Sequence, residues 1–296
     1  MAKISIIIPT VNSPWIDQVL VSLSQQTYSL AGVEVLVIGL DEPGRLQAFE
    51  RVKFIDTKQK IRPARVRNLG IQQASGDILC FLDDDCIPEP DWLARLLEPY
   101  ASSVDIVGGS MTFPRDSYWT LCDSLANFAD ILVEVPSGWR DYLPSLNFSA
   151  RRTVFDAVGL FDEEFPFPAG EDTELTQRMR QAGYRLWFAA DALVYHAAYR
   201  QSGLVNWRRA WQFGQSVAVN PALCELLHPS SFFQHWLVMF ISAWPRALIA
   251  TGKIFQQYPS LLKYWRSIPG VTMSKFAWQL GAATALQQSY SRRKNR

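Results

Sequence analysis

The first hundred residues alternate between short apolar runs and longer amphipathic stretches. Apolar runs at residues 3–9, 33–40 and 77–83 predict strands that are buried on both faces, and residues 52–56 and 104–108 predict two further strands. Residues 13–25, 63–74 and 91–100 predict helices, with Ser13 as the cap of the first and Pro14 at its first position. This alternation of strand and helix predicts an α/β fold, with a mostly parallel Rossmann-like sheet and helices on both faces.

The pattern changes after residue 110. Residues 110–150 are irregular and rich in Pro and aromatic residues, and they give no prediction. Helices are predicted over residues 151–158 and 173–182, and two short strands over 185–189 and 192–195. Beyond residue 203 the pattern is helical and interrupted by prolines. We therefore expect a domain over residues 1–202, followed by a helical region over residues 203–296.

The charge is divided between these two parts. The chain has 296 residues and a formal net charge of +1, and its composition, 48% hydrophobic and 19% charged, is that of a folded protein. Residues 203–296 carry eleven basic residues and one acid, whereas residues 1–202 carry a net charge of −9. Six of the eleven tryptophans also follow residue 202. This asymmetry indicates two regions with different partners.

Basic residues and tryptophans beside apolar helices are typical of contact with an anionic membrane surface, which is the expectation for residues 203–296. The alternative is that these helices pack on the first domain or form a dimer interface. No nucleic-acid-binding motif is present, so no nucleic acid partner is expected. The N-terminus lacks the pattern of a signal peptide, and the most apolar stretch, residues 235–250, contains Pro245 and Arg246. These features predict a cytoplasmic protein, peripheral on the inner face of the cytoplasmic membrane.

Polar residues stand where several predicted strands end. Thr10, Asp41 and the triplet Asp83, Asp84 and Asp85 follow different strands, and this topology gathers strand ends along one edge of the sheet. Adjacent carboxylates repel one another, so a triplet gains from a bound cation, and hard oxygen ligands suit Mg²⁺ or Mn²⁺. The alternative is a solvated acidic turn with no ligand.

The context of the triplet carries a family resemblance. Residues 64–92 read ARVRNLGIQQASGDILCFLDDDCIPEPDW, which resembles the central signature of family 2 glycosyltransferases with the GT-A fold. Residues 6–12 (IIIPTVN) resemble the first strand and loop of that family. Further matches follow in the family's order at residues 158–165 (VGLFDEEF), 170–172 (GED) and 194–196 (VYH). The resemblance covers roughly residues 3–200, and it identifies residues 1–202 as a nucleotide-sugar-binding catalytic domain.

The resemblance implies roles for the matching positions. Asp83 and Asp85 would be the outer members of the DxD motif, which touch the ribose and the metal, and His196 would be a further metal or phosphate ligand. Asp172 would be the general base, while Glu171 could serve in catalysis or as a helix cap. The positions implied to border the donor are Pro9, Thr10, Asp41, Arg67, Asn68, Asp83 and Asp84.

Two segments depart from the family pattern. An Asp-Asp-x-Ser type of run is common after the second strand, but this chain has GLDEPG over residues 39–44. The nucleotide is therefore not predicted, although Asp41 remains placed to meet the base. The family's Gly-Ala-Asn segment appears here as SLN over residues 145–147.

The chemistry of sugar transfer agrees with two separate acidic sites. A divalent cation stabilises the leaving diphosphate, and another carboxylate accepts the proton of the attacking hydroxyl. Glu171 and Asp172 open a predicted helix, whose dipole is expected to keep them ionised. The sequence thus predicts an inverting, Mn²⁺- or Mg²⁺-dependent glycosyltransferase that acts on a glycan or lipid-linked acceptor in cell-surface polysaccharide or glycolipid synthesis. The alternatives are a nucleotidyltransferase, which is expected to show a Gly-rich loop, and a degenerate module that binds without turnover.

Overall fold

The computed structural model describes residues 2–165, 167–217 and 235–294. The chain forms two compact units. The first comprises residues 1–112, 130–163 and 171–197, and the second comprises residues 113–129, 164–170 and 198–296. The second unit therefore takes in residues 113–129, 164–170 and 198–202 from within residues 1–202.

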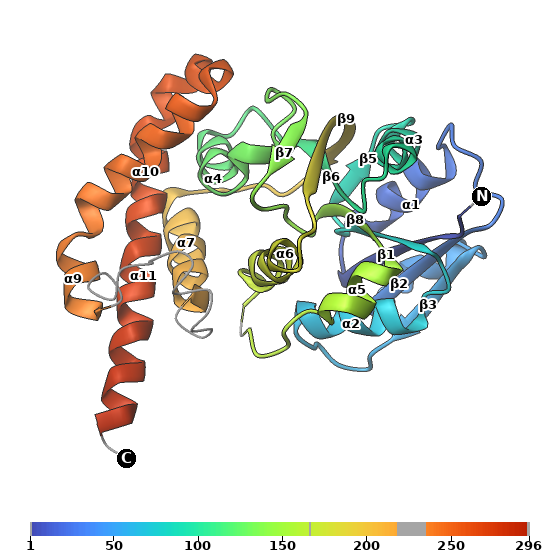
Figure 1. The fold of residues 1–296 in the computed structure, drawn as a ribbon, viewed down its shortest axis with the longest axis horizontal. Helices are drawn as coiled ribbons and strands as arrows, with labels where there is room; N and C mark the ends of the chain where they lie inside the picture. The colour runs from blue at the N-terminus through green and yellow to red at the C-terminus, as the bar shows by residue number, and fades with distance from the viewer. Residues whose placement is uncertain (1, 166, 218–234, 295–296) are drawn as a thin grey trace. The chain divides into compact units, whose positions relative to one another are not determined.

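The first unit is built on a nine-stranded sheet in the order β3-β2-β1-β4-β8-β6-β9-β5, with β7 paired to β9 (Figure 1). Its strands are β1 (Ile4–Val11), β2 (Val33–Leu40), β3 (Val52–Asp56), β4 (Ile78–Leu82), β5 (Cys86–Pro88), β6 (Ile106–Thr112), β7 (Gly138–Arg140), β8 (Asn147–Arg151) and β9 (Leu186–His196). Its helices are α1 (Ile16–Ser24), α2 (Pro63–Gln73), α3 (Trp92–Leu97), α5 (Arg152–Val158) and α6 (Glu171–Gln181), with the 3₁₀ helices η1 (Arg45–Ala48) and η2 (Glu98–Ser102).

The predicted α/β fold is confirmed. Strands β3, β2, β1 and β4 are mutually parallel, and β4 is buried along its whole length, as its apolar run predicts. The next strand, β8, runs antiparallel between β4 and β6. Helix α2 packs on β1 and β2, and α3 packs on β6 and β9. The carboxyl ends of β1, β2 and β4 therefore lie along one edge of the sheet.

Three local predictions were wrong. The first helix begins at Ile16, so Pro14 precedes it, and Ser13 does not cap it. The Ser13 hydroxyl instead accepts a hydrogen bond from the Trp15 N–H at 3.2 Å and donates one to the Asp84 carbonyl at 3.0 Å. The two short strands predicted over residues 185–195 form one continuous strand, β9, which includes residues 190–192. The helix predicted over 91–100 is shorter and continues as the 3₁₀ helix η2.

The second unit is helical. It contains α4 (Tyr118–Phe128), α7 (Gly203–Val217), α9 (Trp236–Ile241), α10 (Ala243–Gln257), the 3₁₀ helix η5 (Pro259–Ser267) and α11 (Ile268–Lys294). Helix α11 runs between α7 on one side and α9 and α10 on the other (Figure 1). Within the described ranges, none of the helices has the length and apolar character needed to cross a membrane.

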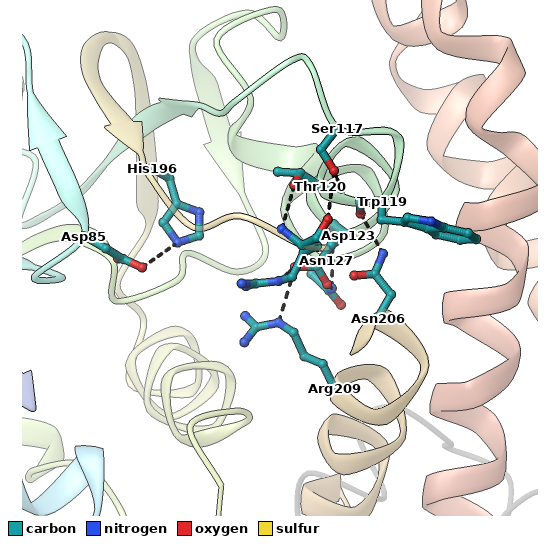
Figure 2. A network of polar contacts seen from close by, with 10 residues as sticks. Asp85, Ser117, Trp119, Thr120, Asp123, Asn127, His196, Asn206 and Arg209 are labelled. Carbon is teal, nitrogen blue, oxygen red and sulfur yellow. Dashed lines mark hydrogen bonds and ion pairs between the residues drawn. The ribbon is translucent and has the colours of Figure 1, made fainter. Parts of the chain in front are cut away.

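A buried ion-pair network joins α4 to α7 and to the segment that precedes α7 (Figure 2). Asp123 of α4 is 4% exposed and pairs with Arg200 at 2.9 Å and with Arg209 of α7 at 3.3 Å. The Ser117 hydroxyl caps α4 by accepting from the Thr120 N–H, and it donates to the Arg200 carbonyl. These contacts tie the chain that follows β9 to α4.

Gly39 sets the close approach of β1 and β2 at the edge where the polar strand ends lie. Its φ is +141°, and a Cβ at this position would lie 1.8 Å from the Thr10 carbonyl oxygen. We expect Gly39→Ala to lower the free energy of unfolding by roughly 3 kcal/mol, because backbone strain and a backbone clash act together. The measurement is urea unfolding followed by circular dichroism.

Gly32→Ala is the matched control for this change. Gly32 also has a positive φ, +85°, but its Cβ would meet no atom within 4 Å. Only strain is added there, so the loss should be about 1 kcal/mol. Equal losses for the two variants would contradict the role assigned to the approach of Gly39 and Thr10.

Candidate active site

The acidic triplet follows β4 directly, and its backbone is held in place on both sides. The Asp83 N–H donates to the Leu146 carbonyl at 3.1 Å, and the Cys86 N–H donates to the Asp83 carbonyl at 3.0 Å. Strand β5 then begins at Cys86 and pairs with the end of β9. The three carboxylates point to three different partners, so each has a separate environment.

Asp83 is joined to α2 and α6 through one buried guanidinium. Nη2 of Arg67 donates to Oδ1 of Asp83 at 2.9 Å, and Nη1 donates to Oε1 of Glu171 at 3.0 Å. The Arg67 side chain is 6% exposed and the Glu171 side chain 4%, whereas that of Asp83 is 32% exposed. Burial lowers the pKa of Arg67, but the charges of Asp83, Glu171 and Asp172 raise it by more. The net pKa lies above its usual value, so the guanidinium stays charged. Arg67 therefore binds the strand end to the start of α6.

Asp84 contacts the loop that follows β1. Its Oδ2 accepts a hydrogen bond from the Val11 N–H at 3.3 Å. Burial raises the pKa of Asp84 to about 7, Asp85 and Asp83 add to this rise, and the Thr10 hydroxyl and the Val11 N–H oppose it. Asp84 thus holds Val11, the residue after the predicted donor residue Thr10, against the triplet.

Asp85 and His196 form the candidate cation site (Figure 2). Oδ2 of Asp85 lies 3.5 Å from Nε2 of His196. With Sγ of Cys86 they form a group of potential ligand atoms that all lie within 4.8 Å of one another. Burial, followed by the charges of the triplet, raises the pKa of the Cys86 thiol well above its usual value, so the thiol is neutral when no cation is bound.

This donor set fits the predicted cation. A carboxylate oxygen and an imidazole nitrogen leave several positions for water and phosphate oxygens, as is usual for such ions. Mg²⁺ strongly prefers oxygen ligands, so the imidazole favours Mn²⁺. Asp83, predicted as a further metal ligand, is not in the group of potential ligands found among the described residues, and its Oδ1 bonds to Arg67.

Glu171 and Asp172 open α6, as predicted. Burial opposes the expected effect of the helix dipole, which is to keep both carboxylates ionised. Burial and the adjacent Asp172 raise the pKa of Glu171 to about 7, although Arg67 opposes the rise. Burial also raises the pKa of Asp172, against the effects of Arg67, the Ser145 and Thr173 N–H groups and Tyr142. Desolvation outweighs the dipole at this helix start.

Three donors orient the Asp172 carboxylate. The Tyr142 hydroxyl and the Ser145 N–H both donate to Oδ2 at 3.2 Å, and the Thr173 N–H donates to Oδ1 at 2.8 Å. Tyr142 and Ser145 lie in the irregular segment before β8, for which no helix or strand was predicted. Because Leu146 of the same segment accepts from Asp83, residues 142–146 position both acidic groups.

The remaining predicted donor residues occupy the same edge or support it. Pro9 and Thr10 lie at the end of β1, opposite Ile38 and Gly39 of β2. Asp41 follows β2, and its carboxylate accepts hydrogen bonds from the N–H groups of Arg45 and Leu46. These bonds hold the first two residues of η1. Asn68 is 4% exposed, and its amide is bonded to both the N–H and the carbonyl of Phe161 and to Glu163. In this structure Asn68 holds residues 161–163 against α2.

Comparison with known proteins shows the family of this chain. The chain matches the model of glycosyl transferase family 2 over residues 5–121 and that of glycosyl transferase family group 2 over residues 78–286. It is 32% identical over 209 residues to glycosyltransferase AglE of Haloferax volcanii, covering 66% of this chain and 67% of the relative. It is 27% identical over 242 residues to the glucosyl-dolichyl phosphate glucuronosyltransferase of the same organism, covering 71% and 72%.

Solved structures show the same fold. The mannosyltransferase PcManGT from Pyrobaculum calidifontis, in complex with GDP-Man and Mn²⁺, superposes with a TM-score of 0.63 at 19% identity, over 97% of this chain and 88% of that one. TarS of S. aureus, residues 1–349 in complex with UDP-GlcNAc, gives a TM-score of 0.55 at 18% identity, over 98% and 92%. The class of protein defined here is a GT-A glycosyltransferase, an enzyme of the EC 2.4 class. The chain belongs to glycosyl transferase family 2.

The buried Arg67–Glu171 pair can be tested by its effect on stability. We expect Arg67→Met to lower the free energy of unfolding by roughly 3–5 kcal/mol, because it leaves a buried carboxyl without its cation. Adding Glu171→Gln should restore a large part of the loss, since the orphaned charge is then removed. Urea unfolding of both single variants and the double variant gives the coupling energy.

Arg95→Met serves as the control, since Arg95 pairs with Asp91 and Glu98 on the exposed surface of α3. Its removal should leave the unfolding midpoint nearly unchanged. Additive losses in the Arg67 and Glu171 variants would contradict a coupled buried pair.

Proposed function

We propose that this enzyme transfers a sugar from a nucleoside-diphosphate donor to a hydroxyl of a glycan or lipid-linked acceptor, with inversion and with a divalent cation. The observation that carries this proposal is the division of the acidic side chains into two sites joined through Arg67. Asp85 and His196 are placed to hold a cation, and Asp172 is placed separately on α6. A single displacement needs both functions at once and in different places.

The named relatives support the donor and the acceptor class. PcManGT was solved with GDP-Man and Mn²⁺ and TarS with UDP-GlcNAc, so nucleotide sugars are the donors expected for this fold. The name of the Haloferax volcanii glucuronosyltransferase gives a lipid-linked substrate, glucosyl-dolichyl phosphate. A lipid-linked acceptor at the inner face of the cytoplasmic membrane, in glycolipid or surface polysaccharide synthesis, is therefore the setting that we propose.

The residues of the chain carry the following steps. Residues at the ends of β1, β2 and β4 hold the nucleotide, with Asp83 directed by Arg67 toward the ribose. A cation between Asp85 and His196 would neutralise charge on the leaving diphosphate. Asp172 accepts the proton of the acceptor hydroxyl as that oxygen attacks the sugar. Tyr142 and the Ser145 N–H hold the Asp172 carboxylate in one orientation. The acceptor oxygen forms a bond to the anomeric carbon. The bond from that carbon to the diphosphate oxygen breaks on the opposite side, and the nucleoside diphosphate leaves.

The two alternative functions are separated by different observations. Membership of the glycosyltransferase family decides against a nucleotidyltransferase. A degenerate binding module remains a test outcome, since the family's relatives include a protein named as an inactive polypeptide N-acetylgalactosaminyltransferase-like protein of Macaca fascicularis, 26% identical over 172 residues. The chain retains Asp85, His196 and Asp172, with the contacts described above, and this supports turnover.

Donor binding should depend on a cation. In a thermal-shift screen with UDP, GDP, CDP and dTDP, we expect one nucleotide to raise the melting temperature with Mn²⁺ present and to have little effect without it. Asp85→Ala should abolish the shift, because it removes a ligand of the cation. Asp91→Ala, a nearby exposed acid that pairs with Arg95, should retain it. A shift that is the same with and without Mn²⁺ would contradict the proposed cation site.

Turnover should depend on the ionised form of Asp172. We expect Asp172→Asn to keep the donor-induced thermal shift and to lower kcat by roughly 10²–10⁴-fold, the usual contribution of a general base. The measurement is nucleoside diphosphate release from the donor identified above, with a membrane lipid extract as the source of acceptor. Loss of donor binding together with activity would point to a structural role instead.

Tyr142 offers a pH readout of the same carboxylate. The pKa of Asp172 is raised, so activity is present at high pH and is lost as the pH falls through that value. The Tyr142 hydroxyl favours the ionised form, so Tyr142→Phe should raise the pKa of Asp172 further. The acidic limb of the kcat/KM profile should then move to higher pH. An unmoved limb with a lower plateau would contradict the assignment of Asp172 as the base.

A further inference from the structure

Helices α9 and α10 divide their side chains sharply between two sides. Met239, Ala243, Ala247, Thr251 and Phe255 recur every four residues and are buried. This stripe packs against α11, where the Thr272 hydroxyl bonds to that of Thr251 at 3.2 Å. Arg246 also reaches α11, donating to Gln279 at 3.1 Å. The second unit thus fixes which side of these helices faces outward.

The outward side is apolar and exposed. It presents Phe240, Ile241, Leu248 and Ile249, and Trp265 of η5 is a further exposed apolar side chain later in the chain. Ile241 is 72% exposed and Trp265 is 60% exposed. Large apolar side chains that are exposed together in one segment mark a site of interaction.

The charges beside these side chains are all of one sign. Lys253, Lys263 and Arg266 are exposed on α10 and η5, and residues 226–296 contain no Asp or Glu. A second copy of the chain, docked through the same face, would bring positive charge against positive charge. An anionic lipid surface complements the charge, accepts the apolar side chains between its headgroups, and is the environment in which tryptophan at a boundary is favoured.

We propose that the outer face of α9, α10 and η5 is a docking surface for an anionic lipid bilayer, with these helices lying in the plane of the interface. This surface is built entirely from the second unit and goes beyond the proposed transfer reaction. Apolar insertion and attraction to lipid headgroups contribute separately, so the surface should respond differently to changes in its apolar and its basic residues.

Vesicle flotation of the full chain tests this directly. At low salt the protein should float with vesicles of phosphatidylglycerol and phosphatidylcholine, and at least tenfold less of it should float with phosphatidylcholine alone. A variant with Ile241→Ser, Leu248→Ser and Ile249→Ser should lose most of its flotation. Leu204→Ser on α7 is the control, because Leu204 is as exposed as Phe240, at 57%, and lies outside this face.

A second variant separates charge from folding. Lys253→Gln, Lys263→Gln and Arg266→Gln leave the apolar residues in place, and they should remove the preference for anionic vesicles. Far-UV circular dichroism and the melting temperature show whether each variant is folded. The cation-dependent nucleotide shift, which reads the first unit, separates failure of docking from failure of the proposed function. Absence of flotation by the wild-type chain at low salt would overturn the proposal. So would a wild-type dimer in sedimentation equilibrium that the apolar variant converts to monomer, since that would assign the face to a second copy.

Discussion

The arrangement of the site depends on the buried guanidinium of Arg67. A cation with so little exposure is stable only when carboxylates surround it, and Asp83 and Glu171 do so from opposite directions. One of these acids ends a central strand and the other begins a helix more than eighty residues later in the chain. Satisfying Arg67 therefore requires α6 to start beside the end of β4. The same contact that neutralises a buried charge brings the two acidic sites of the enzyme into one unit.

This constraint also assigns different tasks to neighbouring acids. Five carboxyl groups lie at or near the edge of the sheet, and as five charges they would repel one another. Arg67 engages Asp83 and Glu171, and burial raises the pKa of Asp84 to about 7, which lowers its charge at neutral pH. Asp85, beside His196, and Asp172, held by Tyr142 and Ser145, are the acids to which the proposed function gives the cation and the base roles. In that proposal environment, rather than residue type, distinguishes the cation ligand from the base.

The sequence predicted those parts of the fold that depend on local pattern. Strand β2 has the predicted bounds, because a continuous apolar run before turn residues has few other interpretations. Strand β3 also has the predicted bounds, although its side chains are half-buried or exposed. The edge formed by Thr10, Asp41 and the triplet followed from parallel topology. Strand β8 was not predicted, because its partners β4 and β6 are distant in the chain and the segment before it has no periodicity. The role of Tyr142 was hidden for the same reason, since only the folded chain brings its hydroxyl to Asp172.

Asn68 shows the limit of inference from a motif. Its position in the family signature implied a place beside the nucleotide, whereas its amide is fully engaged by residues 161–163. The central claim that remains is that Asp85 and His196 hold the cation, apart from the base. Pulsed electron paramagnetic resonance of bound Mn²⁺ with a nucleoside diphosphate tests this claim most directly. If His196 binds the cation, a nitrogen coupling from one imidazole is expected, which is retained in His235→Gln and lost in His196→Gln. A coordination sphere of oxygen alone, or a nitrogen coupling that survives His196→Gln, would contradict it.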